Sequence, residues 1–79
     1  MIKLPVLSSE EVIKILVKKF NFEIVRQKGS HIVLRKYQNN DKIVTVIPNH
    51  KEIKIGTLKS ILKLAKISPE DFLKKYQEL

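Results

Sequence analysis

Apolar residues recur with a helical period near both ends of the chain and with strand-like alternation in the middle. Ser8 and Glu11 have capping-box spacing, and the apolar residues that follow recur every three to four positions. This stripe consists of Val12, Ile13, Leu16, Val17 and Phe20. The pattern predicts a first helix that ends near Lys19, with Asn21 as its stop residue.

Three segments with strand character occupy the middle of the chain, at residues 22–28, 31–37 and 42–47. Gly29 separates the first two, a polar turn at residues 38–41 separates the next two, and Pro48 ends the third. Because these links are short, we expect an antiparallel meander. Simple alternation divides the first segment between two faces, with Phe22, Ile24 and Arg26 on one and Glu23, Val25 and Gln27 on the other.

Two further helices are predicted after the strands. Residues 49–55 form a polar loop, and Gly56-Thr57 precede the second helix. Ser68 and Pro69 have the order of a cap and a first helical residue, and they open a short third helix. The second helix has a core-facing stripe of Leu58, Ile61, Leu62 and Ala65 and a basic stripe of Lys59, Lys63 and Lys66, and the third has an apolar face of Phe72, Leu73 and Tyr76.

The predicted order α-β-β-β-α-α defines an α+β fold in which a three-stranded antiparallel sheet packs against helices on one face. This is the layout of the double-stranded-RNA-binding domain, which also carries basic residues at the start of its second helix. With 79 residues, the chain is expected to form one domain over residues 1–79. A domain of this size has a modest core, so a shallow surface site is expected, which suits an extended substrate.

Composition excludes several chemistries. The chain has no cysteine, which removes disulfides, zinc–thiolate sites and thiol nucleophiles. With only two histidines and few acids near them, the sequence predicts no metal site and no cofactor. The N-terminal residues lack the apolar stretch of a signal peptide, and no apolar run is long enough to span a membrane. We therefore expect a soluble, cytoplasmic protein without a membrane partner.

Positive charge is concentrated in the middle of the chain. Residues 24–69 hold ten Lys and Arg against Asp41 and Glu52, a net charge of +8 that equals the charge of the whole chain. A field of one sign on so small a body favours polyanions such as RNA. A general role in solubility is the alternative interpretation.

Gly29-Ser30-His31 is the first candidate for chemistry. Glycine permits a tight turn, which places the following histidine at the start of a strand, fixed but accessible. A histidine there can act as a general acid or base on an RNA 2′-hydroxyl. The alternative is a surface or packing residue. Ser30 and His31 are adjacent in a strand and point to opposite faces, so they do not form a nucleophile–base pair.

The remaining candidates are expected to contact RNA rather than to perform chemistry. The polar loop after Pro48 either contacts RNA or is held by its own hydrogen bonds. The start of the second helix offers backbone N–H groups and lysines to phosphates, although a solvated helix face is an equal interpretation. The predicted RNA-binding residues are Lys28, Gly29, Ser30, His50, Lys51, Lys59 and Lys63.

Taken together, these motifs resemble the HicA toxins of HicA–HicB toxin–antitoxin pairs. The resemblance rests on Lys28-Gly29-Ser30-His31, on Pro48 with His50 two residues later, and on Gly56-Thr57-Leu58-Lys59-Ser60-Ile61-Leu62. The segments at residues 7–13, 22–27 and 67–73 also fit, so it covers nearly the whole chain. One position departs from the pattern: Ile32 stands where many members have a second histidine or an aromatic residue.

The resemblance implies a fold like the double-stranded-RNA-binding domain and an mRNA interferase activity that cuts mRNA and stops translation. It places the catalytic histidine at His31 and implies a HicB-type antitoxin that covers this site. The second catalytic group is left open. Two other hypotheses use the same basic residues: a non-catalytic RNA-binding module in which His31 is structural, and a protein-interaction domain whose basic face meets an acidic partner.

Overall fold

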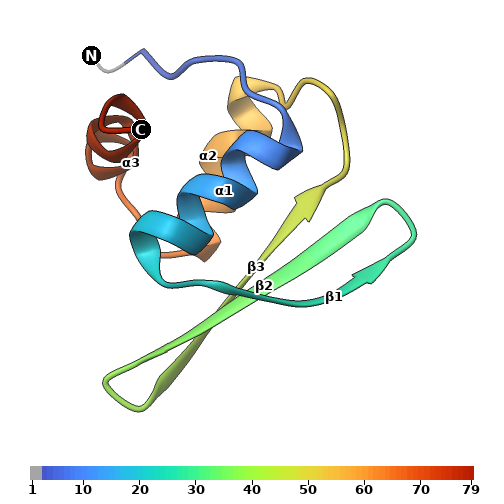
Figure 1. Cartoon of the computed structure of the whole chain (residues 1–79), viewed down its shortest axis with the longest axis vertical. Coiled ribbons are helices and arrows are strands. Elements are labelled where there is room, and N and C mark those ends of the chain that lie inside the picture. Colours follow the sequence, from blue (N-terminus) through green and yellow to red (C-terminus); the bar gives the residue numbers. More distant parts are fainter. Residues whose placement is uncertain (1–2) are drawn as a thin grey trace.

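The computed structural model describes residues 3–79, so Met1 and Ile2 of the predicted domain lie outside the described part. Figure 1 shows helices on one side of a twisted sheet. The order matches the predicted α-β-β-β-α-α, and the α+β fold class is confirmed. The elements are α1 (Ser9–Phe20), β1 (Glu23–Lys28), β2 (His31–Gln38), β3 (Asp41–Pro48), α2 (Ile55–Leu64) and α3 (Pro69–Gln77).

Helix α1 begins with the predicted capping box. The Ser8 hydroxyl accepts from the Glu11 N–H, and the Glu11 carboxylate accepts from the Ser8 N–H. The predicted apolar stripe is wrong at two positions, because Ile15 is fully buried whereas Val17 is 37% exposed. Val12, Ile15 and Leu16 form the face that packs inward, so the stripe is rotated relative to the predicted one.

The sheet is an antiparallel meander in the order β1-β2-β3, as predicted. Both hairpins have two-residue turns. Asn39 and Asn40 both have positive φ, which is the pattern of a type I′ turn. In the first hairpin Gly29 has a φ of 59°, and Ser30 does not have a positive φ, which is the pattern of a type II′ turn. These tight turns fix the register of the strands.

The side-chain pattern predicted for β1 is wrong from Arg26 onward. Ile24 pairs with Leu34, but the next pair is Arg26 with Val33, so Val25 is the extra residue of a β-bulge. Because Val33 faces away from the buried side of β2, Arg26 lies on the face opposite to Ile24 rather than beside it. Simple alternation cannot anticipate a bulge.

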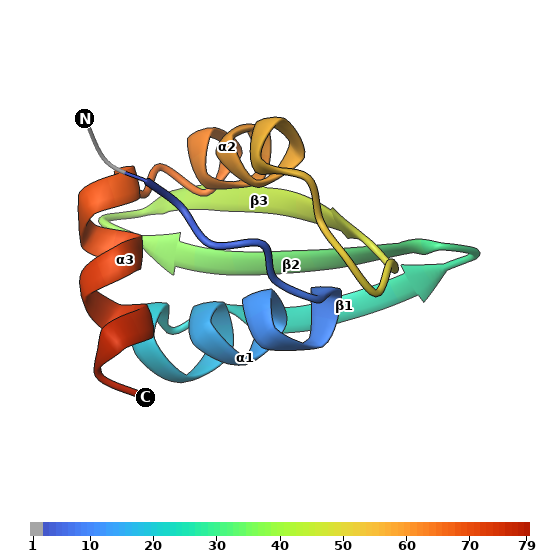
Figure 2. The same cartoon turned by 90° about the horizontal axis from the view of Figure 1, so that it is seen from above.

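The core lies between the sheet and the helices. Figure 2 shows α1 and α2 side by side over the same face of the sheet, with α3 across one end of both helices. Ile32 and Leu34 of β2 and Ile43 and Ile47 of β3 point into this layer. One buried polar contact ties the layers together: the hydroxyl of Thr45, fully buried, donates to the Ile61 carbonyl at 2.9 Å.

Helix α2 starts earlier than predicted. It begins at Ile55, so Gly56 and Thr57 belong to its first turn instead of preceding it, and the polar loop is one residue shorter. Its predicted core stripe, Leu58, Ile61, Leu62 and Ala65, is buried as expected. The helix ends with Lys66 in the left-handed conformation (φ 58°). The Lys66 N–H donates to the Lys63 carbonyl and the Ile67 N–H to the Leu62 carbonyl, which is a Schellman motif built on lysine.

Helix α3 closes one end of the core. Ser68 caps it by accepting from the Asp71 N–H, and Pro69 stands in the first turn, as predicted. Phe72 is completely buried, and Tyr76 packs at the margin of the core. Within the described residues 3–79, no helix is long and apolar enough to cross a membrane.

Candidate functional site

His31 is the first residue of β2 and directly follows the tight Gly29-Ser30 turn. Its pairing partners are Lys28 on β1 and Pro48 on β3. Cross-strand partners have Cβ atoms about 4.5–5.5 Å apart on one face of a sheet, so the side chains of Lys28 and His31 start next to each other on the same face. The side chain of His31 is exposed and makes no hydrogen bond with another of the described residues. It is therefore placed by the backbone and open to a large substrate.

The loop after β3 is fastened to the turn that carries His31. The Asn49 N–H donates to the Ser30 carbonyl at 2.6 Å. The His50 carbonyl accepts from the Ser9 N–H at 3.0 Å, which joins the loop to the start of α1. Three segments far apart in sequence therefore meet at one corner of the molecule: the first hairpin turn, the loop that begins at Asn49 and the N-terminus of α1.

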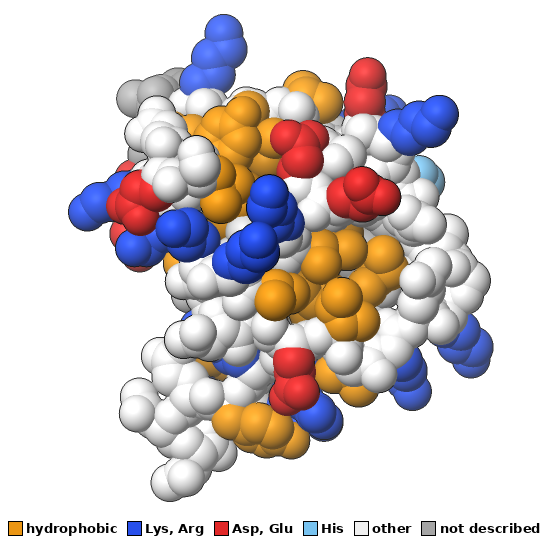
Figure 3. Space-filling model, in the orientation of Figure 1, with side chains coloured by type: hydrophobic (Ala, Val, Ile, Leu, Met, Phe, Trp, Pro, Cys, Tyr) orange, Lys and Arg blue, Asp and Glu red, His pale blue; other side chains and the backbone are white. Residues whose placement is uncertain are grey.

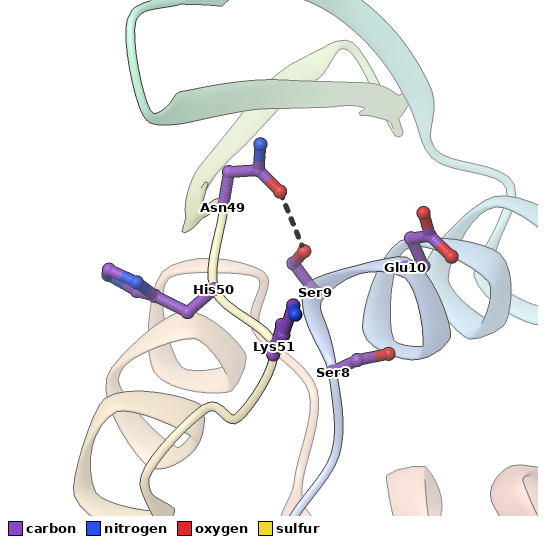
Figure 4. Close-up of a pocket in the computed structure, with 6 residues that line it drawn as sticks. All are labelled: Ser8, Ser9, Glu10, Asn49, His50 and Lys51. Carbon is purple, nitrogen blue, oxygen red and sulfur yellow. Dashed lines mark hydrogen bonds between the residues drawn. The ribbon is translucent and has the colours of Figure 1, made fainter.

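A side-chain hydrogen bond completes this junction. Ser9, which is only 2% exposed, donates from Oγ to Asn49 Oδ1 at 3.1 Å. Figure 4 shows the Asn49 amide turned toward Ser9, whereas the His50 imidazole points away from that bond. The shallow cleft at this junction has a volume of about 470 Å³ and is lined by Ser8, Ser9, Glu10, Asn49, His50 and Lys51. His50 and Lys51, which are both exposed, line the side of the cleft that faces solvent.

Ser9 is the site residue that sequence reasoning missed. Its place before Glu10 and Glu11 reveals a helix start, but nothing local indicates a partner forty positions further on. One interpretation of the loop after Pro48 is that its own hydrogen bonds hold it in place. This applies to Asn49 and to the backbone of His50. The His50 and Lys51 side chains are free of hydrogen bonds and ion pairs to other residues in the described range 3–79.

The predicted RNA-binding residues divide into two groups by position. Lys28, Gly29, Ser30, His50 and Lys51 gather at the corner that carries His31. Lys59 lies on the exposed side of α2, one turn after its start, and Lys63 lies in the last turn. A rise of about 1.5 Å per residue puts Lys63 roughly 12 Å along the helix axis from Ile55. Lys63 is thus directed toward the opposite end of the molecule from the His31 corner.

One lysine of the basic segment, Lys36, contacts the end of α1. Lys36 Nζ donates to the Phe20 carbonyl at 3.2 Å, and it lies 5.1 Å from the centre of the Phe22 ring. A cation at the C-terminal end of a helix is favourable because the last carbonyl groups have no partner within the helix. Lys36 therefore stabilises the end of α1, although by sequence it belongs to the same basic segment as Lys28.

These features define a small basic α+β domain with an exposed histidine, fixed by a tight turn, at a corner rich in cations. Comparison with protein families identifies the protein more specifically than these features do. The family model described as HicA toxin of bacterial toxin-antitoxin matches residues 9–67, which include every element except α3. The chain belongs to this family, and it is the toxin of a toxin–antitoxin pair. A comparison with curated proteins gives no match.

Proposed function

We propose that this toxin is an endoribonuclease of the mRNA interferase type, with His31 as a catalytic acid or base. The observation that carries the proposal is the position of His31, exposed at the first residue of β2 and paired with Lys28. Family membership supports the substrate class, and the charge of +8 supports binding of a polyanion. The proposed cellular effect is the arrest of translation in the cytoplasm, with a HicB-type antitoxin as the inhibitor.

The proposed reaction uses the ribose 2′-hydroxyl as the nucleophile. A base removes its proton, the 2′ oxygen attacks the adjacent phosphorus, and the bond from phosphorus to the 5′ oxygen breaks. The 5′ oxygen takes up a proton as it leaves. The products are a 2′,3′-cyclic phosphate and a 5′-hydroxyl end. His31 supplies one of the two proton transfers, while Lys28 stabilises the charge on the phosphate.

The decisive experiment is cleavage of an end-labelled mRNA in EDTA by the parent chain and by His31→Ala. Loss of a general acid or base lowers the rate about 10²–10⁴-fold, so His31→Ala should be nearly inactive. The comparison variant is His50→Ala, which removes the other exposed histidine of the same corner; as a predicted RNA contact it should raise KM while kcat stays near that of the parent. Circular dichroism establishes that all three chains are equally folded.

Three results would contradict the proposal. Equal cleavage by the parent and His31→Ala points to another catalytic residue or a contaminant. A 5′-phosphate product that requires Mg²⁺ excludes attack by the 2′-hydroxyl. RNA binding without any cleavage by the parent would instead establish the non-catalytic RNA-binding module.

The RNA contacts are tested by salt dependence. Each phosphate contact on single-stranded RNA contributes about −0.7 to the slope of log K against log salt concentration. Lys28→Gln should therefore reduce the slope by about 0.7 if Lys28 contacts a phosphate. Lys74→Gln, which removes an exposed lysine of α3, is the control and should leave the slope unchanged.

A further inference from the structure

One face of the sheet, the open face, has no covering layer. The helices cover the other face, and no element within residues 3–79 packs on this one. Because Ile32 and Leu34 of β2 point into the core, the residues that alternate with them point to the open face. These residues are His31, Val33, Arg35 and Tyr37. The exposed histidine therefore shares a surface with side chains far from its own corner.

The open face carries positive charge on both outer strands. The strand register puts Arg26 and Lys28 of β1 and Lys42 of β3 on it, and all three are exposed without an ion pair within the described chain. Glu23 is the acid of this face, and its carboxylate is already paired with Arg35 at 3.2 Å. Figure 3 shows Lys and Arg side chains along the lower right margin, on the side of the sheet away from the helices. This arrangement favours a polyanion.

A shallow hollow lies in the open face. Its volume is about 210 Å³, and it is lined by Val25, Arg26, Val33, Arg35, Lys42 and Val44. Each of the three strands thus contributes one cation, and the valines offer aliphatic surface between the cations. The backbone of RNA has the same two parts, since its phosphates bind cations and the carbon atoms of its riboses contact apolar surface.

Tyr37 is the aromatic residue of the open face. It is 62% exposed, and the Arg35 guanidinium lies 5.3 Å from the centre of its ring. Aromatic rings and guanidinium planes are the surfaces on which the bases of single-stranded RNA stack. A basic groove for the backbone combined with an aromatic ring for the bases is the usual composition of a site for single-stranded nucleic acid.

Tyr37 and His31 lie on the same face of the same strand. They are six positions apart on β2, and a rise of about 3.4 Å per residue puts about 20 Å between their Cα atoms. An extended RNA strand covers this distance in a few nucleotides. Val33 and Arg35, which lie between the two residues on β2, both line the hollow. The three features therefore follow one another in a line.

We propose that single-stranded RNA crosses the open face, with a base stacked on Tyr37 beside Arg35 and its backbone in the hollow, and reaches His31 with the phosphate that is cut. The choice of RNA as the ligand rests on the proposed function. Tyr37 is then a substrate-binding residue several nucleotides away from the cut. A duplex gains nothing from this contact, because its bases are already stacked on one another.

The test is the affinity of the toxin for a labelled single-stranded 2′-O-methyl RNA, measured by fluorescence anisotropy. This probe lacks the 2′-hydroxyl, so binding is measured without cleavage. Tyr37→Ala should weaken binding about tenfold, and Tyr37→Leu by a similar factor, because both remove the stacking surface. Tyr37→Phe keeps the ring and should bind like the parent. Leu64→Ala is the control, since Leu64 of α2 is exposed to nearly the same extent (57%) and should not matter.

Two further readouts separate RNA contact from a structural role. The chain has no tryptophan, so Tyr37→Trp introduces a single reporter whose emission a stacked base should quench. A probe with an abasic site at the stacked position should not quench it. Lys42→Gln should reduce the slope of log K against log salt concentration by about 0.7, whereas Lys74→Gln should leave it unchanged. Circular dichroism establishes that all chains are equally folded.

The proposal is overturned if Tyr37→Ala and Tyr37→Leu bind the probe as the parent does, or if Tyr37→Phe is as weak as Tyr37→Ala. It is also overturned if the Tyr37 variants bind the antitoxin more weakly with unchanged affinity for RNA, because the ring then serves a protein contact. Failure of the proposed function gives a different result. A parent that binds the probe through Tyr37 but does not cleave RNA would overturn the catalysis and leave the stacking site standing.

Discussion

Ser9 and Asn49 form a hydrogen bond, Oγ to Oδ1 at 3.1 Å, that ties the start of α1 to the loop after β3. The Asn49 N–H in turn holds the Ser30 carbonyl, one residue before His31. These two hydrogen bonds link the start of α1 to the residue before His31. We infer that Ser9, whose side chain is nearly inaccessible and donates to Asn49, is a positioning residue for His31.

Ser9→Ala removes this bond, and it should lower the free energy of unfolding by about 1 kcal/mol. If the junction positions His31, kcat for RNA cleavage should fall while KM stays within about twofold, because the cations that bind RNA are untouched. Ser60→Ala is the control: its hydroxyl donates only to the Gly56 carbonyl within α2. A decrease in kcat equal to that of Ser60→Ala would show that Ser9 is merely structural.

Thr45→Val tests the buried hydrogen bond between β3 and α2. Valine has nearly the same shape, so the change removes the hydrogen bond to Ile61 without leaving a cavity. The Ile61 carbonyl keeps its bond from the Ala65 N–H, and the expected loss is about 1 kcal/mol. In a domain of this size that corresponds to a decrease in Tm of about 4–8 °C, measured by calorimetry. An unchanged Tm would mean that the buried hydroxyl contributes nothing net.

Lys66→Gly should stabilise the protein. Lys66 adopts a left-handed conformation at the end of α2, which costs a residue with a Cβ about 1–2 kcal/mol relative to glycine. We expect a gain of about 1 kcal/mol in chemical denaturation. The same substitution at Lys59, inside the helix, should have the opposite sign and a similar size. Destabilisation by Lys66→Gly would contradict the assigned Schellman motif.

Gly29→Ala separates backbone strain from steric clash at the turn before His31. A Cβ at Gly29 meets no atom within 4 Å, so the cost comes from its φ of 59° alone. The expected loss is about 1 kcal/mol, with lowered cleavage because the turn must shift. Gly56→Ala also meets nothing within 4 Å, and it should stabilise α2 by about 0.5–1 kcal/mol. Equal effects at the two glycines would refute the role of the turn.

The elements were predictable because local patterns define them. The capping box at Ser8, the buried stripe of α2 and the cap at Ser68 depend on residues within a few positions of each other, and all three are confirmed. The predictions were wrong at positions whose register or burial depends on contacts between elements distant in sequence. The bulge at Val25 shifts the register of an exposed edge strand, and the burial of Ile15 rather than Val17 depends on how α1 lies on the sheet.

The candidate site likewise consists of residues that local sequence patterns identify and contacts that only the folded chain creates. Gly29, Ser30 and His31 identify the turn from sequence, because glycine and histidine each have a local chemical reason to be there. The Ser9–Asn49 bond and the open face of the sheet follow from pairing between distant segments. Among the predicted RNA-binding residues, Lys63 lies in the last turn of α2, away from the corner that carries His31.

The junction at Ser9 also has a consequence for the order of events during synthesis. His31 leaves the ribosome well before Asn49, yet the Ser30 carbonyl gains its partner only when Asn49 arrives. The Leu7 carbonyl likewise accepts a hydrogen bond from the Ile53 N–H, so the N-terminal segment is held by a residue synthesised more than forty positions later. A chain interrupted before residue 49 contains the histidine but not the framework that orients it. Under the proposed function, the growing chain should therefore be unable to cleave RNA until the segment around Asn49 has emerged and folded.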